Sequence, residues 1–176
     1  CAAPDGTVYI ADAGNHRVRQ LRDGRVTTIA GRETPRDELG FEQGGHQDGP
    51  VSQALLKCPV DIDRTPTGEL LIADLGNHAL RRLVGGALAT HALSSTQPLS
   101  APTGVLAVGS AIFVADPETP RLRAWQPGGL GPTGNLAGVA PRCPTGLARL
   151  PDGALVVVDA EWNAVFAVEP SGKSPL

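Results

Sequence analysis

The sequence predicts an all-β protein built from repeated units of four short antiparallel strands, the arrangement of propeller blades or of a similar array. Three observations support this. A segment beginning at Tyr9 recurs at Leu71, looser copies lie at 113–116 and 156–159, and no stretch shows the period of an amphipathic helix. The aspartates that end the copies, at 12, 74, 116 and 159, are 62, 42 and 43 residues apart. A period near 42 residues is typical of one propeller blade.

The second unit shows the expected elements in order. Four stretches read as strands a to d, with strand a innermost, because each is short, apolar or alternating, and bounded by turn residues. Gly and Asn suit these turns because they tolerate positive φ, and an Asp carboxylate can accept nearby backbone N–H groups. The four predicted strands cover residues 59–63, 69–73, 78–83 and 87–93.

The two clearest copies share the run Tyr/Leu-Ile-Ala-Asp-x-Gly-Asn-His-x-Val/Leu-Arg, which includes Asn15-His16 and Asn77-His78. This run resembles the NHL repeat. The resemblance extends over essentially the whole chain in four units, and it is weaker where 117–120 and 160–163 replace the Gly-Asn-His turn. It implies a β-propeller, usually of six blades, that serves mainly as a rigid platform for partners. A minority of related propellers are enzymes.

The chain is therefore expected to form one NHL-type propeller arc over residues 1–176, with blades at roughly 1–58, 59–101, 102–143 and 144–176. The first unit is expected to lack strand a and the last to lack strand d, as in part of a six-bladed ring. An open array exposes an inner strand edge and a blade face. The remaining blades, or else a neighbouring subunit, are expected to cover these ends.

Composition limits the possible functions. Aromatic residues make up 3% of the chain and Met is absent, so the core must consist of Val, Leu, Ile and Ala. A net charge of −3 argues against a nucleic-acid groove, and we interpret the pairs Arg17/Arg19 and Arg81/Arg82 as the solvated side of strands. The sequence contains no run of 18 apolar residues and therefore predicts no membrane span. Because the chain begins at Cys1 rather than Met, the sequence indicates no compartment.

The step of 62 residues locates one long loop, residues 31–58, which includes a possible helix at 51–56. Long loops in compact domains are usually functional or mobile. The strand directions place this loop on the same face as the Asn-His turns and one mouth of the central channel. Two interpretations remain open, a structural cap on the blade and a contact site for a ligand or partner.

If the chain binds a partner, this face is the predicted docking surface. Between residues 32 and 48 the loop carries two positive and five negative charges, which favours a basic patch on the partner. These residues are Arg32, Glu33, Arg36, Asp37, Glu38, Glu42 and Asp48. The candidate binding residues are Asn15, His16, Asp37, Glu38, Glu42, His46, Asp48, Asn77 and His78.

The sequence predicts no catalytic residues, cofactor or metal ligands. His16 and His78 are repeat equivalents, expected to pack against the neighbouring blade and to hydrogen-bond a backbone group. The four repeated aspartates are expected to cap their own turns with local N–H groups. Cys58 and Cys143 lie two blades apart, too far for a disulfide, and are expected to be buried small apolar residues. The inner strands supply just two carboxylates, Asp61 and Asp63.

The favoured function is a non-catalytic protein-interaction or scaffold module, either in a multidomain chain or as a subunit of a larger assembly. The alternative is a propeller enzyme, a metal-dependent lyase or lactonase-like hydrolase with its site at the channel mouth. A lesser alternative is the propeller domain of a thioredoxin-like fusion protein, which the run at 47–59 resembles loosely.

Overall fold

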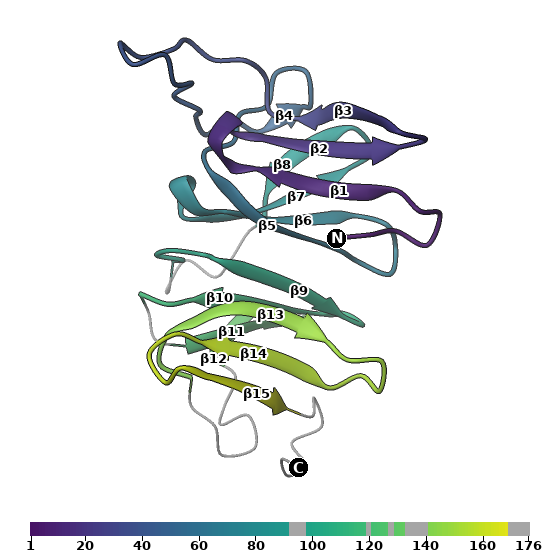
Figure 1. Cartoon of the computed structure of the whole chain (residues 1–176), viewed down its shortest axis with the longest axis vertical. Helices are drawn as coiled ribbons and strands as arrows, with labels where there is room; N and C mark the ends of the chain where they lie inside the picture. The colour runs from purple at the N-terminus through teal and green to yellow at the C-terminus, as the bar shows by residue number, and fades with distance from the viewer. Residues whose placement is uncertain (92–97, 119–120, 127–128, 133–140, 169–176) are drawn as a thin grey trace.

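The computed structural model of the chain describes residues 1–91, 98–118, 121–126, 129–132 and 141–168. Figure 1 shows four antiparallel sheets that follow one another from the N-terminal end to the C-terminal end. This arrangement confirms the all-β propeller fold. We name the sheets blades 1 to 4 in chain order. The exact residue boundaries between the blades remain a proposal.

The strands match the predicted order within each unit. Blade 1 contains β1 (Val8–Asp12), β2 (Arg17–Arg22) and β3 (Arg25–Ala30). Blade 2 contains β5 (Pro59–Arg64), β6 (Leu70–Asp74), β7 (Ala79–Val84) and β8 (Ala87–Thr90). Blade 3 contains β9 (Gly104–Val108), β10 (Ala111–Asp116), β11 (Arg121–Gln126) and β12 (Gly129–Pro132). Blade 4 contains β13 (Pro144–Arg149), β14 (Leu155–Asp159) and β15 (Ala164–Val168); the segment expected to follow, 169–176, lies outside the described residues.

Helical structure in the described part of the chain is limited to two 3₁₀ turns, Ala13–Asn15 and Leu75–Asn77. Each turn lies between strands b and c of its blade, immediately after a repeated aspartate. Among the described residues, no helix is long and apolar enough to cross a membrane.

Aliphatic side chains fill the spaces between blades. Three separate clusters lie between successive blades. Val18 and Ile72 belong to the cluster between blades 1 and 2. Leu80 and Val105 belong to the one between blades 2 and 3, and Leu122 and Val157 to the one between blades 3 and 4. The innermost strands β5, β9 and β13 are neighbours. The predicted aliphatic core is confirmed, with Phe113 as one aromatic member of the third cluster.

The structure adds detail at the start of the chain. The amide of Tyr9 donates to the Cys1 carbonyl at 2.8 Å, and Ala2 forms a bridge with Val8. These pairings are the same as those of Asp63 and Arg64 with β6, so Cys1 and Ala2 occupy the last two positions of a strand a. The expectation that the first unit wholly lacks this strand is corrected to this extent.

The segment predicted as a possible helix, 51–56, is a turn instead. The amide of Ala54 donates to the Pro50 carbonyl at 2.9 Å, which closes a single helical turn. This turn does not continue into a helix because Leu55 pairs with Gln47. Just before the turn, Gly49–Pro50 forms the short strand β4, which pairs with β8 as a fifth strand of the blade 2 sheet.

Candidate functional site

The repeated aspartates bind the residues that lead into strand a. In blade 2, the Asp74 carboxylate accepts the amide of Lys57, the side-chain amide of Asn77 and Nη1 of Arg81, each at 2.8 Å. Asp74 and Arg81 both have side chains that are 0% exposed. The carboxylate therefore joins the start of strand a, the b–c turn and strand c of one blade.

Other blades repeat this contact with different donors. Asp116 accepts the amides of Ser100 and Ala101, at 3.1 and 2.8 Å. Asp159 accepts the amides of Arg142 and Cys143, at 2.6 and 3.0 Å. We call Lys57–Cys58, Ser100–Ala101 and Arg142–Cys143 the pre-strand residues.

The predicted caps by local N–H groups are confirmed at Asp159, which also accepts the amides of Glu161 and Trp162. They are wrong for Asp12 and Asp74, whose carboxylates make no hydrogen bond to the backbone of the following turn. The donors to Asp12 are the side chains of Asn15 and Arg19. The donors to Asp74 are the side chains of Asn77 and Arg81 and the pre-strand amide of Lys57.

The turn histidines link blade 1 to blade 2 and blade 2 to the segment that leads into blade 3. His16 Nε2 bonds to the Glu42 carbonyl at 2.7 Å, while Nδ1 accepts the Cys58 amide at 2.9 Å. Since a carbonyl only accepts, Nε2 must carry the proton and the ring is the neutral Nε2–H tautomer. His78 uses the other ring nitrogen, Nδ1, to bond to the Ser100 carbonyl, ahead of the next strand a. The expected bonds to backbone groups are confirmed.

The positive backbone angle of the turn falls on the histidine rather than on Gly or Asn. His16 and His78 have φ of 57° and 53°, and Asn163 takes the same position in blade 4 with φ of 50°. Gly76 has a different function: a Cβ there would lie 2.7 Å from the Lys57 carbonyl, to which its amide donates at 2.8 Å. The glycine is needed for the close approach of the turn to the pre-strand residues.

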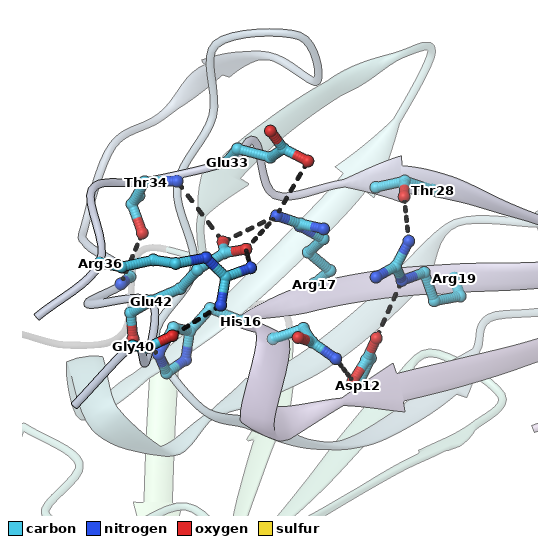
Figure 2. Close-up of polar contacts among 12 residues, drawn as sticks. Asp12, His16, Arg17, Arg19, Thr28, Glu33, Thr34, Arg36, Gly40 and Glu42 are labelled. Carbon is cyan, nitrogen blue, oxygen red and sulfur yellow. Dashed lines mark hydrogen bonds and ion pairs between the residues drawn. The ribbon is translucent and has the colours of Figure 1, made fainter.

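Glu42 anchors the long loop to blade 1 (Figure 2). Its side chain is 3% exposed, and both of its oxygens lie 2.7 Å from Nη2 of the buried Arg17. Arg36 Nη2 lies 3.2 Å from Oε1, and the Thr34 amide bonds to Oε2. A buried carboxylate between two guanidinium groups is a structural link and is not exposed to a partner.

Arg81 anchors the other end of the loop to blade 2. Besides Asp74, its guanidinium bonds to Asp48 at 2.6 Å and to the Leu55 carbonyl at 3.1 Å. Asn77 donates to the Gly45 carbonyl at 2.8 Å. The loop therefore lies over the b–c turns of both blades, on the face predicted from the strand directions.

The interpretation of Arg17 and Arg81 as solvated strand residues is wrong, because both are buried and paired. One signal in the sequence indicates that Arg81 is paired with a carboxylate. Asp74 and Arg81 are seven residues apart, as are Asp12 and Arg19, and Asp116 and Arg123, and each of these pairs forms an ion pair.

The predicted binding residues thus separate into two groups. Most of them make contacts within the chain. Asn15 bonds to Asp12, and His46 bonds to Thr90. The contacts of the others are described above: His16, Glu42, Asp48, Asn77 and His78. Asp37 and Glu38 are exposed at the tip of the loop. Beside them lie two residues that the sequence reasoning missed, Leu39 and Phe41, which are 81% and 63% exposed.

The two inner-strand carboxylates connect neighbouring blades. Asp61 accepts the Val105 amide at 2.8 Å and Asp63 accepts the Ala107 amide at 2.7 Å, both from β9. Burial raises the pKa of Asp61 above its ordinary value, although the amides of Val105 and Ile62 oppose the shift. These carboxylates act as acceptors for the inner edge of blade 3.

The remaining candidates for chemistry are separate from one another. Within the described ranges, no three His, Cys, Asp or Glu side chains are placed to hold a metal ion. Cys1, Cys58 and Cys143 are free thiols. Cys58 and Cys143 are half-buried, less buried than expected.

Comparison with models of protein families identifies an NHL repeat at residues 1–21. The Protein SUPPRESSOR OF QUENCHING 1, chloroplastic, of Arabidopsis thaliana is 33% identical over 81 residues, which are 45% of this chain and 7% of that protein. A solved putative gluconolactonase matches 98% of this chain and 60% of its own, with a TM-score of 0.70 and 18% identity. A catalytically inactive virginiamycin B lyase from Staphylococcus aureus, solved with quinupristin, matches 98% and 52%, with a TM-score of 0.64 and 17% identity.

The chain spans between about half and three fifths of the length of these solved proteins and a small part of the curated one. At 17% and 18% identity, the likeness to the lyase and the putative lactonase is one of fold. The chain therefore carries an NHL repeat at its N-terminal end and has the blade fold of six-bladed propellers, about half of which it matches.

Proposed function

We propose that this chain is a non-catalytic protein-interaction module and that the tip of the long loop, residues 37–41, contacts the partner. One observation carries the proposal. Leu39 and Phe41 expose most of their side chains on a segment that the fold holds in place. Large apolar side chains displayed in this way are typical of protein contact sites.

The tip is ordered by its own hydrogen bonds. The Asp37 carboxylate accepts the amides of Leu39 and Phe41, each at 2.9 Å, and the Asp37 amide donates to the Phe41 carbonyl at 2.8 Å. Arg36 Nη1 donates to the Gly40 carbonyl at 2.6 Å. Because the same arginine contacts buried Glu42, the tip is connected to the blade 1 core. A preorganised tip loses little conformational entropy on binding.

The charges around the tip indicate the chemistry of the partner. Asp37 and Glu38 are exposed beside the apolar pair, whereas Glu42 is neutralised by Arg17 and Arg36. We therefore propose a partner with an apolar pocket bordered by basic residues. Such complementarity raises the association rate and weakens binding as salt increases.

The enzyme alternative has less support from this chain. The fold is shared with a lyase and a putative lactonase, but the carboxylates of the inner strand and of the b–c turns already accept amides from neighbouring segments. The thioredoxin-fusion alternative agrees with one finding, that the curated relative is far longer than the matched region.

We also propose that further blades of the same ring cover the two end faces, with a neighbouring subunit as the alternative. Val8, Ile10 and Val26 are exposed on blade 1, and Val158 pairs with exposed Val165 on blade 4. The isolated chain should then self-associate through these faces. Val26→Lys with Val165→Lys should lower the association constant in sedimentation equilibrium, and an unchanged constant would contradict this use of the faces.

The docking proposal is tested by photo-crosslinking in extracts of the source cells. A photoreactive phenylalanine analogue at Leu39 should crosslink one defined protein, which is then purified. The same analogue at exposed Leu150, which lies on the a–b turn of blade 4, is the matched control. Equal capture from both positions would reject the loop tip as the docking site.

Binding of the purified partner then separates the two contributions. Leu39→Ser with Phe41→Ser should speed dissociation, because the apolar anchors are lost. Asp37 also orders the tip, so the electrostatic variant is Glu38→Lys, which should slow association at low salt and have little effect at high salt. Unchanged kinetics in both variants would overturn the proposal.

A further inference from the structure

A second feature lies on the opposite face, between blades 2 and 3. The a–b turns of these blades, at 65–69 and 109–111, border a cavity of about 460 Å³. This volume is within the range of small-molecule sites. Much of its lining is apolar, from Pro66, Ala107, Ala111, Ile112 and Trp125. Because a–b and b–c turns lie at opposite ends of strand b, these a–b turns are remote from the b–c turns under the long loop. The lining residue His91 directly follows Thr90, to which His46 and Asp48 of the loop bond.

An aromatic pair forms part of the cavity wall. The rings of His91, after β8, and Trp125, on β11, have centroids 4.6 Å apart and planes at 79°. Nε2 of His91 is buried and has no hydrogen-bond partner in the described part of the chain. Because Nε2 has almost no solvent-accessible surface, the His91 ring contributes to the wall through its packing against Trp125 and does not offer this nitrogen to the cavity.

The charged groups of the cavity neutralise each other. Arg82 Nε donates to Glu69 Oε2 at 2.9 Å, and Nη2 donates to Oε1 in a bidentate pair. The Arg82 hydrogen bonds hold the pKa of Glu69 below its usual value. Burial, together with the nearby Arg82 charge, lowers the pKa of His91, so the imidazole is neutral at pH 7. Among the described residues that line it, the cavity therefore contains no uncompensated charge to attract an ion.

We propose that this cavity binds an uncharged, mainly apolar small molecule whose ring lies against Trp125. An ionised ligand would lose its hydration without meeting an opposite charge. This site is independent of the docking role proposed for the loop.

The test uses Trp125 as a reporter. The chain has two tryptophans, so Trp162→Phe leaves Trp125 as the single source of tryptophan fluorescence. Bromine quenches indole fluorescence on contact, and three probes of one shape differ in charge: 4-bromobenzyl alcohol, 4-bromobenzoate and 4-bromobenzylammonium. We expect saturable quenching by the alcohol. The two ions should bind at least about ten-fold more weakly, since each loses hydration in the cavity.

Two variants locate the binding. Ser110→Tyr places a ring at the exposed rim and should abolish saturation. Its matched control is Ser52→Tyr, at an exposed serine on the long loop, which should change nothing.

The outcomes are distinct. Linear quenching by all three probes, or equal saturation in Ser110→Tyr, would overturn the proposal. Stronger binding of the benzoate would assign the cavity to an anionic ligand and would also reject it. Trp125→Phe, which leaves the exposed Trp162, must show linear quenching, because otherwise the reporter does not measure this cavity.

Discussion

Blades 2 and 4 hold the same carboxylate by different means. Asp74 in blade 2 is compensated mainly by side chains, with the guanidinium of Arg81 at 2.8 Å. Asp159 in blade 4 is compensated by four backbone amides, and Phe166 stands at the position equivalent to Arg81. The repeat therefore fixes what the carboxylate binds, the pre-strand residues, but leaves open how its charge is balanced.

The largest effect is expected where the compensation is one buried side chain. Arg81→Met would leave the Asp74 charge buried and unpaired, which costs about 3–5 kcal/mol of the free energy of unfolding. Urea titration measures the loss. The control is Arg19→Met, whose half-exposed pair with Asp12 should contribute less than about 1 kcal/mol. Similar losses in both variants would show that burial does not distinguish the two pairs.

A smaller loss is expected in blade 4, where several amides share the charge. Asp159→Asn should cost about 1.5–3 kcal/mol at pH 7, because the amide group offers fewer acceptors to these donors. Burial alone would raise the pKa of Asp159, but the amides of Trp162, Cys143, Arg142 and Glu161 outweigh it, and the pKa is lowered.

This shift sets a pH dependence for the same variant. A lowered folded-state pKa means that the contribution is complete above the unfolded-state value near 4 and is lost as pH falls through the folded-state pKa. The stability difference between the parent and Asp159→Asn should therefore shrink below pH 4. A difference that stays constant from pH 7 to pH 3 would contradict this account of the charge.

The long loop offers a third case, a carboxylate held by two arginines. Glu42→Gln leaves Arg17 buried beside a neutral group and should cost about 1–3 kcal/mol. Hydrogen exchange should quicken in residues 34–44 and remain unchanged in blades 3 and 4. If exchange quickens across all blades instead, the loop is part of the global folding unit rather than a local element anchored by Glu42.

The smallest effect is expected at the tip of this loop. Leu39→Ser with Phe41→Ser removes exposed side chains and should change the free energy of unfolding by less than about 0.5 kcal/mol. The thermal unfolding midpoint measures this. A clear loss would mean that these residues pack against the chain, which would remove the main support for the docking proposal.

The sequence predicts the fold well, because strand alternation and turn residues are local signals. The strands around Asp74, the aliphatic core and the position of the loop above the b–c turns all follow from spacing and strand direction. The histidine bonds to neighbouring backbone also follow, since His16 and His78 recur at one place in the repeat.

The details of the loop could not be predicted in this way. Burial of Glu42 depends on Arg17, 25 residues away, and no periodic pattern links them. Arg81 was missed because an alternating strand favours a solvated interpretation, although its spacing from Asp74 recurs in three blades. The cavity beside Trp125 is formed by turns of two blades, and its existence depends on how the blades pack.

The short strand β4 has a consequence for the outer rim of blade 2. Its pairing with β8 covers an edge that would otherwise offer free N–H and C=O groups to another chain. Pro50 ends this added strand and has no N–H to donate, so a further strand cannot extend the ladder at that residue. The loop thus makes this rim a poor template for the addition of a strand from another molecule. The tip of the loop, residues 37–41, is left available for contacts through side chains.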